Sequence, residues 1–206
     1  MRKRVESSNM ADYLQCTEII DFDNLEISSL ANELSKDISS EIELAKKIYE
    51  YVRDKIAHSA DISGTIVTCK ASEVMKTGEG ICYAKSHLLA ALLRKNGIPT
   101  GFCYQLLRLD NEIETSPLIL HGLNAVYLRK LNRWIRIDAR GNKETVYAQF
   151  NISSEQLAFR VHTDLGEVDF PYIFINPDYN AVQALKQSAS IPELWENLPT
   201  SLFRII

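Results

Sequence analysis

Residues 71–105 read ASEVMKTGEGICYAKSHLLAALLRKNGIPTGFCYQ, and this stretch decides the fold. Residues 82–96 have the composition of a helix, with Ala and Leu filling its second half. Gly97 suits the position just after a helix end, and Pro99 prevents the helix from continuing. Residues 88–93 form the longest apolar run of the chain, six residues. We therefore expect this helix to be the central, most buried element.

Cys82 begins this predicted helix, directly after a turn made by Thr77-Gly78-Glu79-Gly80. A helix start presents unpaired N–H groups and a partial positive charge, and both favour a thiolate over a thiol. The two glycines would let the backbone turn tightly and let a substrate approach. Cys82 is therefore a candidate nucleophile, and the alternative is a small buried residue, as most free cysteines are.

Helical signals precede this stretch and strand signals follow it. Apolar residues recur at helical spacing over 27–38, and Ser40 with Glu43 reads as a capping box that opens a second helix. Residues 100–109, 118–128 and 134–139 predict strands, and 110–117 a polar loop. Further strands are expected within 140–150 and 171–175, and short helices at 181–186 and 192–197. Helices followed by an antiparallel sheet indicate an α+β fold.

His121 and Asp138 lie on the two strands of one predicted hairpin. A two-residue turn at Arg129-Lys130 would place the two side chains opposite each other, whereas a turn centred on Leu131-Asn132 would offset them by about four residues. A bulge could restore the contact in the second case. Since an unpaired charge in the apolar strand around Asp138 would be costly, the carboxylate is expected to have a partner. A structural histidine and a strand-end carboxylate are the alternatives.

The composition describes an ordinary globular protein. The chain has 206 residues, 46% of them hydrophobic and 24% charged, and a net charge of −4. One domain spanning 1–206 is expected, with 1–10 as a flexible polar arm. The excess of acidic over basic residues argues against a nucleic-acid partner. No segment is apolar and long enough to span a membrane. Without an export signal, a cytoplasmic location and four unpaired cysteines are expected, and no cofactor or metal motif is visible.

The 71–105 stretch resembles the core of the transglutaminase-like superfamily, whose pattern is A-x-E-V-L…G-x-C…A…L-x-x-A-L-L-R…G-I-P. His121-Gly122 and residues 133–138, RWIRID, resemble the family's later His and Trp…Asp blocks, so that the resemblance covers about 42–150. It implies a papain-like fold in which a central helix packs on an antiparallel sheet. It also implies a catalytic triad of Cys82 as nucleophile, His121 as base and Asp138 as the residue that orients the histidine.

Several departures narrow the resemblance to small microbial members. Tyr83 follows Cys82 where animal transglutaminases have Trp, and no calcium loop is visible. Gly122-Leu123-Asn124 replaces the Ala-Trp-x-Glu that is common after the family's histidine. The paired CxxC motifs of peptide N-glycanases and the Arg-Gly-Gly of arylamine N-acetyltransferases are also absent. The resemblance implies a thiol-dependent hydrolase of amide or peptide bonds that acts through an acyl-enzyme on a peptide, protein or small amide. The alternatives are a protein-glutamine transglutaminase and an inactive protein-binding module; the oligomeric state is not readable.

Other residues carry weaker signals. His87 lies about 140° round the helix from Cys82 and is expected to be structural. His58 follows a predicted helix and is a candidate for lining the cleft. Arg140-Gly141-Asn142 is expected to shape a turn rather than hold a substrate carboxylate. The cysteines outside the predicted site are expected to be bystanders: Cys16, Cys69 and Cys103.

Overall fold

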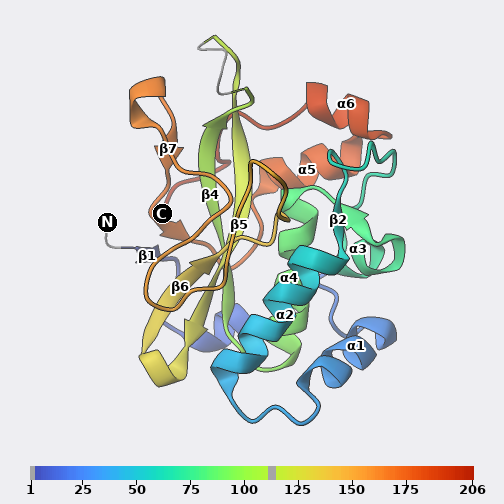
Figure 1. Cartoon of the computed structure of the whole chain (residues 1–206), viewed down its shortest axis with the longest axis vertical. Helices are drawn as coiled ribbons and strands as arrows, with labels where there is room; N and C mark the ends of the chain where they lie inside the picture. The colour runs from blue at the N-terminus through green and yellow to red at the C-terminus, as the bar shows by residue number, and fades with distance from the viewer. Residues whose placement is uncertain (1–2, 111–114) are drawn as a thin grey trace.

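The computed structural model describes residues 3–110 and 115–206 and shows an α+β fold (Figure 1). Four strands form one antiparallel sheet in the order β6-β5-β4-β7. The central pair is β4 (Thr100–Arg108) and β5 (Leu118–Leu128), with β6 (Arg133–Ile137) and β7 (Val168–Asp169) at the edges. Two short parallel pairs complete the strands: β1 (Arg4–Val5) with β8 (Tyr172–Ile173), and β2 (Ala57–His58) with β3 (Glu79–Gly80).

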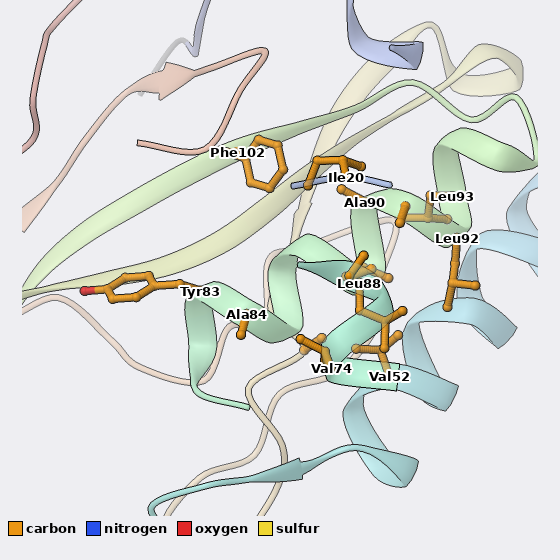
Figure 2. Packing of buried hydrophobic residues seen from close by; sticks show 14 of the residues in the cluster. Ile20, Val52, Val74, Tyr83, Ala84, Leu88, Ala90, Leu92, Leu93 and Phe102 are labelled. Carbon is orange, nitrogen blue, oxygen red and sulfur yellow. The ribbon is translucent and has the colours of Figure 1, made fainter. Parts of the chain in front are cut away.

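The central helix is α4 (Cys82–Lys95), and it packs against β5 on one side. Helices α1 (Leu25–Ser35), α2 (Glu41–Lys55) and α3 (Ala71–Thr77) pack against its other sides. Residues 83–94 of α4 are all buried, as the Ala- and Leu-rich sequence predicts. Figure 2 shows Leu88 beside Val52 of α2 and Val74 of α3, and all three belong to the main hydrophobic core.

Local signals set the helix boundaries. Asn24 and Ser40 accept hydrogen bonds from the first-turn N–H groups of α1 and α2, as N-cap side chains do. After α4, Gly97 takes a left-handed φ of 72°, which ends the helix at the predicted place. The C-terminal part contains α5 (Tyr179–Gln187) and α6 (Ile191–Glu196), and 3-10 turns lie at Met10–Leu14, Arg129–Leu131 and Thr163–Leu165.

Three details differ from the sequence-based expectations, and a fourth expectation is not tested. Residues 71–77 form a helix that was not predicted, and Gly78 ends it with a φ of 73°. Residues 140–150 form no strand beyond isolated bridges such as Lys143 to Val146. The predicted arm is tied down in its described part, because β1 pairs with β8. The predicted loop at 110–117 falls partly on 111–114, which lie outside the described residues.

No helix within 3–110 or 115–206 combines the length and the apolar character needed to cross a membrane.

Replacing Leu88 with alanine should destabilise the fold strongly. Leu88 is 0% exposed in the centre of α4, so the substitution removes buried methyl groups and leaves a cavity (Figure 2). The expected loss in the free energy of unfolding is about 2–5 kcal/mol, measured by urea denaturation. Leu25→Ala is the matched control, because Leu25 is 85% exposed and its loss should cost no more than about 0.5 kcal/mol. Equal losses in the two variants would contradict the central position of α4.

Candidate active site

Cys82 is the first residue of α4 and is half-buried. The preceding residue, Ile81, occupies the N-cap position, and no side chain caps this helix start. The thiol therefore lies beside backbone N–H groups that have no partner within the helix. Gly80, one residue earlier, packs against Ala84 and Thr68, so its missing side chain serves packing rather than the approach of a substrate.

Tyr83, directly after Cys82, anchors the start of α4 to the sheet. Its hydroxyl donates a hydrogen bond to the backbone oxygen of Leu120 in β5. A Cβ atom at Gly122 would lie 2.7 Å from the Tyr83 ring, so only glycine leaves room for this tyrosine. The residues on either side of His121 thus hold Cys82 and His121 close to one another.

His121 and Asp138 are in direct contact: His121 Nε2 lies 2.8 Å from Asp138 Oδ2. The hairpin that brings them together has a four-residue connection over 129–132, in which Asn132 adopts a left-handed φ of 49°. In this hairpin Leu128 pairs with Arg133, a register that neither of the two predicted turns would produce. It offsets His121 and Asp138 by two positions. An offset of two keeps both side chains on the same face of the sheet, where diagonal neighbours can meet.

Asp138 follows the last residue of β6 and is 1% exposed. Its Oδ1 accepts a hydrogen bond from the backbone N–H of Arg140, and its Oδ2 accepts from the backbone N–H of Ala158, both at 3.1 Å. Burial raises the pKa of this carboxyl, but the charge and hydrogen bond of His121 and these two N–H groups outweigh burial and lower it. Asp138 is therefore a carboxylate fixed in position, and the Tyr49 hydroxyl also donates to its backbone oxygen at 3.0 Å.

His121 carries a positive charge in this environment. Burial lowers its pKa, but the negative charges of Asp138 and Cys82 and hydrogen bonds to both raise it to about 10. Asp138 occupies Nε2, so Nδ1 is the ring nitrogen left for Cys82. The edge of the ring packs on Phe159, with ring centroids 5.0 Å apart, which fixes its orientation further.

A cavity of about 320 Å³ opens over Cys82 and His121. Its walls come from the β4–β5 hairpin, the 138–167 segment and the C-terminal part around α6. The polar side chains that line the cavity include those of His58, Arg140 and Arg160. The apolar walls, which make up most of the lining, include Leu107, Ile119, Leu120, Phe159, Trp195 and Leu198.

The structure also locates the secondary candidates. His87 is buried with Nδ1 2.7 Å from the Cys69 oxygen, away from the cavity. His58 lines the cavity. Arg140 lines it too, but its guanidinium is paired with Asp61, and Gly141 turns the chain with a φ of 109°.

Sequence reasoning missed three groups around the triad candidates: Phe159, the Ala158 N–H and Lys85. Lys85 is 1% exposed, and its ammonium donates to the carbonyl oxygens of Arg53 and Ile56 at the end of α2. Burial and the charge of Arg140 lower its pKa to about 7. The only feature of the sequence that could have pointed to Lys85 is its position one helical turn after Cys82. Within the described ranges, no group of side chains has the arrangement of a metal site.

Alkylation by iodoacetamide should be selective for Cys82. Burial raises the pKa of the Cys69 and Cys103 thiols to about 12, so both stay protonated and inaccessible at pH 6. Cys16 is exposed, but burial of part of its thiol also raises its pKa. Peptide mass mapping after brief labelling at pH 6 should find the adduct on Cys82, and Cys82→Ala should remain unlabelled. Labelling of Cys16 at an equal rate would contradict an activated Cys82.

Comparison with solved structures finds proteins of similar fold. A proposed cysteine protease from Cytophaga hutchinsonii has a similar structure, with a TM-score of 0.53 and 18% identity over 65% of this chain and 43% of that one. The periplasmic domain of TgpA from Pseudomonas aeruginosa matches with a TM-score of 0.48 and 16% identity, over 63% of this chain and 46% of the other. The chain thus spans less than half the length of either structure. No curated protein matches the chain.

The family profile gives the assignment. The profile described as the transglutaminase-like superfamily matches residues 28–139, from α1 to the residue after Asp138, more than half of the chain. This range contains α4 with Cys82, the β4–β5 pair with His121, and Asp138. The chain belongs to the transglutaminase-like superfamily.

Proposed function

We propose that this chain is a thiol-dependent hydrolase of amide bonds, with Cys82 as nucleophile, His121 as acid and base, and Asp138 as the residue that orients the histidine. The observation that carries the proposal is the contact of 2.8 Å between the buried Asp138 and His121, which lines the same cavity as Cys82. A buried histidine–carboxylate pair whose histidine shares a cavity with a cysteine at an uncapped helix start is an arrangement suited to acyl transfer.

The charges support a definite sequence of proton transfers. With His121 protonated, Cys82 starts as a thiolate and attacks the carbonyl carbon of the amide, whose oxygen becomes an oxyanion. His121 then donates its proton to the leaving nitrogen as the C–N bond breaks, leaving a thioester on Cys82. The neutral imidazole next takes a proton from water, and the resulting hydroxide attacks the thioester. The acid is released, and the thiolate and the imidazolium are restored.

The cavity supports a substrate with an apolar group next to the scissile bond. Leu107, Ile119 and Leu120 from the β4–β5 hairpin line it, as do Trp195 and Leu198 from the C-terminal part. A volume of about 320 Å³ accommodates one medium-sized side chain or a short peptide segment, the lower end of the range for small-molecule sites. We therefore propose a peptide or small amide with an aliphatic or aromatic acyl part as the substrate class.

Trapping of the acyl-enzyme tests this function. The protein is mixed with the p-nitrophenyl ester of N-acetyl-leucine at neutral pH, quenched in acid and weighed by mass spectrometry. A transient acyl adduct on Cys82 that is absent from Cys82→Ala is expected. Failure of the wild type to form any adduct, with this ester and with its phenylalanine and glutamine counterparts, would favour the inactive binding module.

The same experiment separates hydrolysis from transamidation. When the acyl-enzyme is challenged with a lysine analogue such as cadaverine, a hydrolase releases the free acid and a transglutaminase releases the amide. We expect the acid to dominate, because the cavity is open to solvent and water can reach the thioester. If the amide is the main product, the chain is an acyltransferase rather than a hydrolase.

A further inference from the structure

His58 is placed beside the start of α4 by its backbone. It lies in β2, where it pairs with Gly80 of β3, two residues before Cys82. The N–H of Ser59 also donates to the Gly80 oxygen at 3.3 Å. The side chain lines the same cavity as Cys82 and His121.

The His58 imidazole has no hydrogen-bond partner in the described chain, although it is only 7% exposed. Its Nδ1 is completely buried without a partner. The two other buried histidines are both satisfied, His87 by the Cys69 oxygen and His121 by Asp138. The accessible ring nitrogen is Nε2, which also has no partner among the described residues, and it is the atom that a ligand in the cavity can contact. With Nδ1 buried and unpaired, a neutral ring that carries its proton on Nε2 leaves only an acceptor without a partner.

His58 is also held neutral. Burial lowers its pKa most, and the positive charges of Arg140, Lys85 and His121 lower it further. Asp61 acts in the opposite direction, but its carboxylate is already paired with Arg140 and Lys143. A neutral imidazole carries one N–H donor at every pH near neutrality, and it does not exchange protons there. The charged His121 and the neutral His58 are thus suited to different tasks.

The start of α4 offers the complementary donors. No side chain caps its first turn, and the positive end of the helix dipole lies there. The oxygen of a carbonyl group attacked by Cys82 would become negative beside this helix start, in the cavity that His58 also lines.

We propose that His58 is a catalytic residue that donates a hydrogen bond to the substrate oxyanion, together with the backbone N–H groups at the start of α4. The assignment deepens the proposed function and rests on it.

Two reactions of the same thiol test this role. Acylation by a p-nitrophenyl ester passes through an oxyanion, and its leaving group needs no proton. Alkylation by iodoacetamide displaces iodide at a saturated carbon and forms no oxyanion. His58→Leu removes the N–H donor, and His58→Gln keeps one at a similar position. We expect His58→Leu to slow acylation about 10²–10³-fold, the effect typical of losing one such donor, with alkylation unchanged within about twofold. His58→Gln should recover much of the lost rate.

The outcomes separate this proposal from the proposed function and from a structural role. Acylation of the wild type with equal acylation of His58→Leu would overturn the His58 assignment alone. An equal fall in acylation and alkylation would also overturn it, since His58 would then act by holding Cys82 in place. Absence of acylation in the wild type would overturn the proposed function and the assignment together. The urea midpoint of His58→Leu should not fall, because no hydrogen bond within the protein is lost; His58→Met provides the same comparison if leucine disturbs the packing.

Discussion

Replacing Cys82 with serine should abolish amide hydrolysis and leave the fold intact. A serine hydroxyl stays protonated where a thiol becomes a thiolate. The protonated His121 cannot accept the hydroxyl proton, so no anionic nucleophile forms. The expected loss is at least about 10⁴-fold in kcat/KM, as for removal of the nucleophile of other triads. Turnover of a peptide p-nitroanilide measures it.

Cys16→Ser is the matched control for this substitution. Cys16 is exposed, its thiol donates to the Ile20 oxygen, and it does not line the cavity. Its turnover should equal that of the wild type, and both variants should keep the wild-type circular dichroism. A Cys82→Ser variant within tenfold of wild-type turnover would exclude Cys82 as the nucleophile.

Asp138→Asn should have the second-largest effect, about 10²–10⁴-fold lower kcat with the fold retained. Asparagine is isosteric with aspartate but lacks the charge that raises the pKa of His121. The imidazole then loses its proton near neutral pH, and the thiolate loses its counter-ion. Alkylation of Cys82 across a pH series measures the change: the midpoint should lie higher in Asp138→Asn and in His121→Ala than in the wild type. Identical curves in the three proteins would show that no ion pair exists.

The same ion pair predicts how stability depends on pH. The pKa of His121 is raised from 6.5 to about 10 on folding, so its contribution is fully present below pH 6.5 and is lost as the pH rises toward 10. The pKa of Asp138 is lowered from 3.8, so its contribution is present above pH 3.8 and is lost as the pH falls below that value. The wild type should therefore exceed Asp138→Asn in free energy of unfolding most between about pH 4 and 6.5. Urea titrations at pH 5.5 and 9.5 test this; a gap that widens at pH 9.5 would contradict it.

The two buried neutral histidines, His87 and His58, give the free energy of unfolding the opposite dependence on pH. Burial lowers the pKa of His87 to about 4, despite its hydrogen bond to the Cys69 oxygen, and His58 shifts in the same direction. Both groups bind protons more readily in the unfolded chain, so stability is lost as the pH falls below 6.5. The two dependences are separable because the ion-pair contribution disappears in Asp138→Asn, whereas that of His87 does not.

The sequence by itself determined the central helix and the strands that face it. Glycine at 97 and proline at 99 end α4, and the Ala and Leu run makes it buried, because these are properties of short segments. The order of Cys82, His121 and Asp138 and their assignment to one helix start and one hairpin followed from the same local patterns. The family resemblance rested on these residues, and the matched range contains all three.

The tertiary structure decided which groups meet. Whether His121 reaches Asp138 depends on the four-residue turn at 129–132, whose conformation shifts the pairing by whole residues while the apolar pattern of the strands stays the same. Ala158 and Phe159 join the site from a segment without helical or strand periodicity, so no local signal pointed to them. His58 was recognisable as a candidate, but that it lacks a partner and is held neutral emerges only when Arg140, Lys85 and Asp61 come together from distant parts of the chain. Local segments encode their own periodicity, whereas contacts and charges at a site are sums over residues far apart in sequence, and only the folded chain defines them.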